Sequence, residues 1–182
     1  MNPRRFVLLD RDGVISVYTP GYIVNAKDFQ LAHGSEQALE MFYRNGYEVV
    51  VITNQSCINR GLATRQDIDA VNRRMVEEVK NAGGRIRDIF LCPHTDADNC
   101  SCRKPKPGMI LDAASKYGIE LSQTFFVGDS FTDFQAARSA GCRSIICMTG
   151  NPKTMDAIDS AETKPDAVLN SLLEAAEFII TP

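Results

Sequence analysis

Short apolar runs alternate with stretches of helical periodicity along most of the chain. The run Val49-Val50-Val51-Ile52 has no polar position, which is typical of a strand buried on both faces of a parallel sheet. The other runs are also short, rich in β-branched or aromatic residues and bounded by turn residues. The predicted strands span residues 6–9, 47–52, 86–91, 124–127, 144–148 and, weakly, 167–169.

Segments with the periodicity of amphipathic helices lie between these strands. Ser35 and Thr64 are suited to cap the first two helices at their N-termini, because their hydroxyls can accept from free backbone N–H groups. Later helices are predicted over residues 107–118, over 132–140 and from about 170 onward. The alternation of strand and helix predicts an α/β fold: a doubly wound parallel sheet with helices on both faces.

A chain of 182 residues is long enough to bury one hydrophobic core and short for two. We therefore predict a single domain over residues 1–182. Two connections, 13–34 and 93–106, are unusually long for such a fold. Both are too small for a separate cap domain, but both can shape a pocket.

Composition and charge narrow the classes of partner. A hydrophobic fraction of 44% with 24% charged residues is ordinary for a soluble globular protein. The net charge of −3 gives no reason to expect nucleic acid or an anionic membrane as a partner. The apolar run 6–9 is too short for a signal peptide or a membrane span. We expect a cytoplasmic monomer whose cysteines stay reduced.

Chemically reactive side chains follow several of the predicted strands directly. Asp10, Thr53 and Asp129 each stand at the carboxyl end of a strand, and Cys92 and His94 follow another. Ligands of open α/β sheets bind in the crevice outside these strand ends. The positions therefore predict one functional site at this edge.

The segment Asp10-Arg11-Asp12-Gly13 carries two neighbouring carboxylates. Two adjacent acids repel each other unless a cation balances them, and Mg²⁺ binds a few carboxylates together with substrate phosphate. Asp10 and Asp129 are the candidate magnesium ligands. An aspartate can attack phosphate as a nucleophile, while Asp12 can act as general acid and base. A turn or a calcium loop would use the same residues.

Three further residues fit phosphate chemistry less specifically. Thr53 offers a hydroxyl and an N–H to a phosphoryl oxygen, or it merely caps a strand end. Lys104 can hold the nucleophile and the phosphate as a point charge, or it is a solvated surface lysine. Asp133 can support the magnesium site from behind Asp129, or it only interacts with a helix N-terminus.

The loop 92–102 gathers three thiols and one imidazole. Cys92, His94, Cys100 and Cys102 form a closed set of four soft ligands, which favours structural zinc over a catalytic metal. The polar stretch 95–99 has no apolar residues with which to pack, so the metal would supply its folding energy. The remaining cysteines are predicted to be packed thiols: Cys57, Cys142 and Cys147.

Together these segments resemble the haloacid dehalogenase (HAD) superfamily of phosphotransferases, whose four motifs they match in order over roughly residues 5–150. The matching segments are Asp10-Arg11-Asp12-Gly13, Thr53-Asn54, Lys104, and Gly128-Asp129 with Asp133. The resemblance implies that Asp10 is the nucleophile and Asp12 the acid and base. It also implies Mg²⁺ held by Asp10, Asp129 and the backbone carbonyl of Asp12.

The zinc loop is similar to one branch of that superfamily, the branch holding the D-glycero-D-manno-heptose 1,7-bisphosphate phosphatases and the histidinol phosphatases. The run 53–61 resembles the heptose enzymes, although Cys57 and Asn59 stand where Gly and Ala are expected. The resemblance implies removal of the C7 phosphate from a heptose bisphosphate, in a pathway that supplies ADP-heptose and cell-surface lipopolysaccharide. The expected substrate-binding residues are Asn54, Gln55, Ser56, Arg60 and Arg103.

Two alternatives stay open at this point. The short stretch between His94 and Cys100 is closer to histidinol phosphatases, but a cationic substrate would favour an acid where the chain has Arg60. A phospho-acceptor signalling domain also uses an aspartate, a threonine and a lysine around Mg²⁺. Such a domain needs neither Asp12 nor the zinc loop, so the sequence favours a phosphatase.

Overall fold

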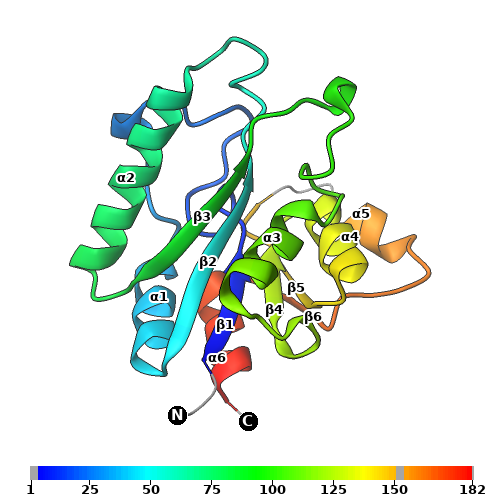
Figure 1. Ribbon diagram of the computed structural model, residues 1–182. Helices are drawn as coiled ribbons and strands as arrows, with labels where there is room; N and C mark the ends of the chain where they lie inside the picture. The colour runs from blue at the N-terminus through cyan, green and yellow to red at the C-terminus, as the bar shows by residue number, and fades with distance from the viewer. Residues whose placement is uncertain (1–3, 151–153, 182) are drawn as a thin grey trace.

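A computed structural model describes residues 4–150 and 154–181 (Figure 1). Its centre is a six-stranded sheet in which each strand runs parallel to its neighbours. The strands are β1 (Arg5–Leu9), β2 (Tyr47–Asn54), β3 (Ile86–Cys92), β4 (Phe125–Gly128), β5 (Arg143–Cys147) and β6 (Ala167–Leu169). Their order across the sheet is β3-β2-β1-β4-β5-β6.

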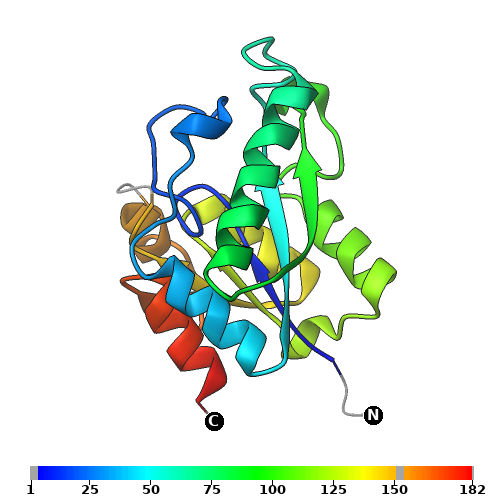
Figure 2. The same ribbon diagram turned by 90° about the vertical axis from the view of Figure 1, so that its left-hand side faces the viewer.

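Helices cover both faces of the sheet, as the alternation of elements predicts (Figures 1 and 2). They are α1 (Ser35–Arg44), α2 (Arg65–Asn81), α3 (Gly108–Tyr117), α4 (Phe131–Ala140), α5 (Thr154–Asp159) and α6 (Leu172–Ile180). Short 3₁₀ turns are η1 (Ala26–Asp28), η2 (Asp96–Asp98) and η3 (Leu121–Gln123). Among the described residues, no helix has the length and apolarity needed to cross a membrane.

The two faces of the sheet bury alternate residues of the same strands. On β1, Val7 packs with residues of α1, α2 and α6, whereas Leu8 packs with residues of α3 and α4. Val49 and Val50 divide in the same way on β2. Since successive side chains of a strand point to opposite faces, a strand between two helical layers must be apolar throughout. That requirement explains the uninterrupted apolar runs in the sequence.

The helix caps agree only partly with the sequence-based expectation. Thr64 caps α2 as predicted, and it forms a reciprocal capping box with Asp67. The cap predicted at Ser35 was wrong: Gly34 occupies the cap position with a φ of 81°, and Ser35 is the first residue of α1. The Ser35 hydroxyl instead donates to the backbone carbonyl of Val14 at 3.0 Å. This bond ties the long first loop to the helix.

The order of the strands places a crevice beside β1. The chain moves outward from β1 to β2 and β3, and then returns to β4 on the other side of β1. The connections that leave β1 and β4 therefore diverge to opposite sides, which opens a crevice at their carboxyl ends. Both chain ends lie at the opposite end of the sheet (Figure 1).

Candidate active site

Asp10 is the first residue after β1, and the backbone fixes its position. Its N–H donates to the carbonyl of Val127 on β4 at 2.9 Å, which continues the sheet pairing by one residue. The carboxylate atom Oδ1 accepts from the backbone N–H of Arg11 at 2.7 Å. Only 8% of Asp10 is exposed. A carboxylate is thus held at the floor of the crevice with little freedom to turn.

Lys104 is a buried cation that joins two acids. Its Nζ lies 2.9 Å from Oδ1 of Asp10 and 2.6 Å from Oδ1 of Asp133, and it donates to the carbonyl of Ile52 at 2.9 Å. The Asn54 side chain holds the Lys104 backbone, donating to its carbonyl at 3.1 Å and accepting from its N–H at 3.2 Å. Lys104 is therefore held both at its ammonium group and at its backbone.

Asp12 is held by hydrogen bonds from Arg11, Gln55 and Ser16. Arg11 grips its carboxylate with a fork, Nε to Oδ1 at 3.0 Å and Nη2 to Oδ2 at 2.9 Å. Gln55 donates to Oδ2 at 2.7 Å, and the Ser16 hydroxyl donates to Oδ1 at 3.3 Å. Arg11 is fully buried, and its Nη1 donates to Oδ1 of Asn72 at 3.0 Å. The two carboxylates of the motif thus have separate cationic partners.

A cluster of acids beside Asp10 has the donor set for a hard divalent cation. Carboxylate oxygens of Asp10, Asp129 and Asp133 lie within 4.8 Å of one another. A Cβ added at Gly13 would lie 2.4 Å from Oδ2 of Asp129, and one added at Gly150 would lie 1.9 Å from it. Only glycine allows two backbones to approach a carboxylate so closely. Oxygen ligands packed in this way fit Mg²⁺.

The pKa values of the site report the same concentration of negative charge. Burial raises the pKa of Asp10 from 3.8 to about 7; Lys104 opposes this rise, and Asp133 and Asp12 add to it. Burial acts to lower the pKa of Lys104, but Asp10 and Asp133 outweigh it and hold that pKa above its usual value. The ammonium stays charged. Asp10 needs a further cation to be fully ionised at neutral pH.

The remaining residues of the predicted site line the wall above β2. Thr53 is buried, and its hydroxyl accepts from Gln55 at 2.9 Å. Ser56 lies 2.9 Å from the hydroxyl of Tyr22, which comes from the long first loop. Arg60 is exposed on the rim, with its Nε 3.5 Å from the Ser56 hydroxyl. The wall therefore carries hydroxyl, amide and guanidinium groups that can bind oxygen-rich ligands.

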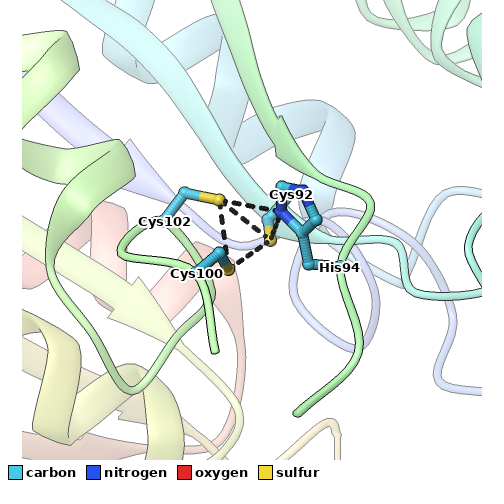
Figure 3. Close-up of side chains that lie close together, drawn as sticks. All are labelled: Cys92, His94, Cys100 and Cys102. Carbon is cyan, nitrogen blue, oxygen red and sulfur yellow. Dashed lines mark hydrogen bonds between the residues drawn. The ribbon is translucent and has the colours of Figure 1, made fainter. Parts of the chain in front are cut away.

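The loop after β3 brings its four predicted metal ligands together (Figure 3). Sγ of Cys92 lies 3.8 Å from Sγ of Cys100 and 3.2 Å from Sγ of Cys102, and Nδ1 of His94 lies 3.3 Å from Sγ of Cys102. A tetrahedral zinc site with Zn–S bonds of about 2.3 Å has ligand separations of about 3.8 Å. A disulfide would need about 2.0 Å. The set fits one zinc ion.

Arg103 is held by contacts within the zinc loop. Its Nε donates to Oδ1 of Asp96 at 2.7 Å, its Nη1 donates to the carbonyl of His94 at 3.2 Å, and its backbone N–H donates to Sγ of Cys100 at 3.4 Å. The guanidinium is thus anchored to the loop, one residue before Lys104.

Comparison with known proteins identifies the family. Residues 101–175 match the family described as HAD-hydrolase-like. The D-glycero-beta-D-manno-heptose-1,7-bisphosphate 7-phosphatase of Neisseria meningitidis is 37% identical over 177 residues, which cover 97% of this chain and 95% of the relative. The chain belongs to the HAD-like phosphatase family.

Further relatives of this HAD-like phosphatase support the same family assignment. The enzyme of the same name from Pseudomonas aeruginosa is 40% identical over 81% of this chain and 83% of its own length. A crystal structure of D,D-heptose 1,7-bisphosphate phosphatase from B. bronchiseptica, complexed with magnesium and phosphate, superposes with a TM-score of 0.91. It is 35% identical, and the match covers 97% of this chain and 98% of the other.

The structure of this HAD-like phosphatase brings together most of the site predicted from sequence. One ion-pair and acid cluster joins Asp10, Lys104, Asp129 and Asp133. Asp133 pairs with Lys104 and also accepts from the backbone N–H groups of Asp129 and Ser130, just before α4. The arginines predicted for substrate lie farther out, on the rim and on the zinc loop.

Two residues that bond around Asp12 (Arg11 and Asn72) were not predicted from the sequence. Arg11 lies inside the first motif, but arginine is usually solvated and the sequence did not indicate that it is buried. Asn72 interrupts the apolar face of α2, where Ile68, Val71 and Met75 are buried beside it. A polar residue at the centre of such a face was the available signal, since buried polar groups require partners.

Purified protein should contain about one zinc ion per chain. Cys102→Ala should lose that zinc and lower the thermal midpoint, because the polar loop depends on the metal for its folding energy. Cys142 is a matched control, being a buried thiol outside the loop whose pKa burial raises to about 12; Cys142→Ala should keep its zinc. Elemental analysis of both variants measures this. A Cys102→Ala protein with full zinc content would contradict the assignment.

Magnesium binding should depend on pH through Asp10. The raised pKa means that the folded protein binds a proton on Asp10 more tightly than the unfolded chain does. In the absence of metal, this proton contributes to the free energy of unfolding below pH 4, and the contribution is lost as the pH rises through about 7. Protons therefore compete with Mg²⁺ below pH 7, at most about tenfold in affinity per pH unit. Thermal midpoints measured against magnesium concentration at pH 6 and pH 8 should show tighter binding at pH 8. Equal affinity would refute this coupling.

Proposed function

We propose that this protein is a magnesium-dependent phosphatase that removes the C7 phosphate of D-glycero-D-manno-heptose 1,7-bisphosphate. The observation that carries the proposal is the Asp10 carboxylate, which is buried and paired with Lys104. It lies close enough to the Asp129 carboxylate, within 4.8 Å, for both to bind one metal ion. Full-length relatives that carry this activity in their names supply the substrate class.

The first half of the reaction forms a phosphoenzyme. A carboxylate oxygen of Asp10 attacks phosphorus, and the bond from phosphorus to the sugar oxygen breaks. The departing oxygen receives its proton from Asp12, two residues along the same loop. Thr53 binds a phosphoryl oxygen, and Lys104 acts on the phosphoryl group as a point charge 2.9 Å from Asp10. Their positions around Asp10 allow them to stabilise the negative charge that spreads over these oxygens.

The second half regenerates the enzyme. Asp12 removes a proton from water, the water oxygen attacks phosphorus, and the bond from phosphorus to Asp10 breaks. Inorganic phosphate leaves the crevice. The Arg11 fork on Asp12 favours the ionised carboxylate, which is the form that removes a proton from water in this step.

Two metals complete the proposal. Magnesium, held by Asp10, Asp129 and the carbonyl of Asp12, neutralises the phosphate that would otherwise repel a carboxylate. Asp133 supports this site through its bonds to the backbone of Asp129 and Ser130. The zinc loop has a structural role: it fixes Arg103 and the backbone leading to Lys104.

Substrate recognition rests on the wall above β2. Asn54 and Gln55 hold Lys104, Asp12 and Thr53 in place behind that wall. Ser56 presents its hydroxyl to the sugar, and Arg60 with Arg103 binds the phosphate that is not removed. Relatives named for the beta anomer indicate the beta sugar. In this proposal residues 1–182 act as one domain, as a monomer in the cytoplasm, where the six cysteines, none of which forms a disulfide in the structure, stay reduced.

The substrate prediction is tested by comparing kcat/KM for three compounds: the beta and alpha anomers of heptose 1,7-bisphosphate and histidinol phosphate. A bisphosphate should be preferred over histidinol phosphate, because Arg60 and Arg103 offer cationic groups to a second phosphate. The beta anomer should be hydrolysed faster than the alpha anomer, as the names of the relatives indicate. Phosphate release is the measurement.

Asp10→Asn serves as the control for contaminating phosphatases. It keeps the size of the side chain, and it should fold and release no phosphate from any of the compounds. Preference of the unmodified protein for histidinol phosphate would overturn the choice of substrate. Near-normal turnover by Asp10→Asn would overturn the nucleophile.

A further inference from the structure

The contact between Arg11 and α2 has no part in the mechanism described above. Arg11 is fully buried, so water cannot solvate its guanidinium and protein atoms must take its N–H groups. In the part of the chain that the structure describes, its three guanidinium nitrogens donate to oxygens of two residues: Nε and Nη2 to Asp12, and Nη1 to Asn72. Asn72 is 61 residues away along the chain. The amide oxygen of Asn72 thus connects α2 to the loop that carries Asp10 and Asp12.

We propose that Asn72 is a positioning residue for the general acid: it fixes the Arg11 fork, and the fork fixes the Asp12 carboxyl. This inference rests on the proposed function, because it assigns Asn72 a part in the protonation of the leaving oxygen.

The geometry of the fork makes the Asp12 carboxyl dependent on Asn72. Two parallel N–H···O bonds from a planar guanidinium set the plane of the carboxylate as well as its distance. The guanidinium can keep that plane only while its third nitrogen, Nη1, is also held. Gln55 and Ser16 donate to the same carboxylate and restrict it further, but neither bonds to the guanidinium in the described structure. Asn72 therefore holds the far side of the fork.

The orientation of the Asn72 amide follows from its partner. Arginine has only donors, so the atom 3.0 Å from Nη1 must be the amide oxygen. Asn72 is 7% exposed on a helix face otherwise occupied by apolar side chains. A polar group is costly at such a position unless it is hydrogen-bonded, and the bond to Arg11 accounts for its presence.

The hydrogen bonds from Asn72 through Arg11 lead to Asp12, the proposed acid, and not to the carboxylate of Asp10, the proposed nucleophile. Asp10 and Lys104 bond to each other, to Asp133 and to backbone atoms. Loss of Asn72 should therefore displace Asp12 while Asp10 and its cation stay in place. A displacement of about 1 Å in a catalytic group can cost about 10²-fold in rate.

The leaving group separates this role from a general structural one. A sugar alkoxide is a poor leaving group and needs a proton from Asp12, whereas p-nitrophenolate leaves without one. The quantity kcat/KM includes only the steps up to departure of the leaving group, where Asp12 acts as an acid. A defect confined to the acid should lower kcat/KM for the sugar bisphosphate and spare that for p-nitrophenyl phosphate.

The main variant is Asn72→Leu, which has a similar branched shape, is larger, and removes the acceptor. Asn72 borders a surface cavity of about 420 Å³, so the branched side chain has room. We expect kcat/KM for heptose 1,7-bisphosphate to fall about tenfold or more, within the range of acid catalysis of ~10²–10⁴-fold. For p-nitrophenyl phosphate the change should stay within about twofold, with unchanged magnesium affinity.

Two further variants serve as controls. Asn72→Asp retains an acceptor oxygen for Arg11 and should restore most of the activity on the bisphosphate. Asn81→Ala removes an exposed asparagine at the end of the same helix and should leave both substrates unaffected. If Asn72→Leu does not fold, as judged by circular dichroism, Asn72→Ala takes its place, because it removes the acceptor without adding bulk.

The outcomes distinguish the inference from the function on which it rests. Equal losses of kcat/KM on both substrates, or no loss on either, would overturn the positioning role while the phosphatase assignment stands. Failure of the unmodified protein to hydrolyse the bisphosphate and p-nitrophenyl phosphate would overturn the proposed function, and the inference with it.

Discussion

The buried ammonium group of Lys104 is the interaction on which the site depends. The crevice between β1 and β4 collects the carboxylates of Asp10, Asp129 and Asp133 in a volume that water barely reaches. Burial and mutual repulsion would neutralise such acids. Lys104 pairs with two of them at once and is itself kept charged by both. The remaining negative charge is what a magnesium ion and a phosphate group together can balance.

The zinc loop contributes to the site because it ends just before Lys104. Cys102 is two residues before Lys104, so closing the four ligands around a metal also fixes the start of the segment that carries the ammonium group. Asn54 holds the same segment from β2. A polar loop with little apolar surface of its own is thereby made rigid enough to hold a buried ion pair.

Much of this architecture was readable in the sequence, because each element is specified locally. Apolar runs such as 49–52 require two covered faces, and residues at strand ends must meet at one edge. The sequence could not indicate the burial of Arg11, which depends on α2 supplying an acceptor from 61 residues away. It also left residues 150–162 unread; there α5 contributes Ile158 to a small core with Phe134, and Thr154 binds the carbonyl of Asp129.

The central claim is that Asp10 forms a covalent bond to phosphorus. It is tested most directly by acid-quenching the protein during turnover of the sugar bisphosphate and locating the phosphoryl group by peptide mass spectrometry. An Asp12→Asn variant treated with p-nitrophenyl phosphate helps, because that leaving group needs no proton and the variant lacks the base that activates water, so the intermediate should accumulate. We expect a phosphorylated peptide whose modified residue is Asp10. A phosphoryl group found on another side chain, with Asp10 unmodified, would contradict it.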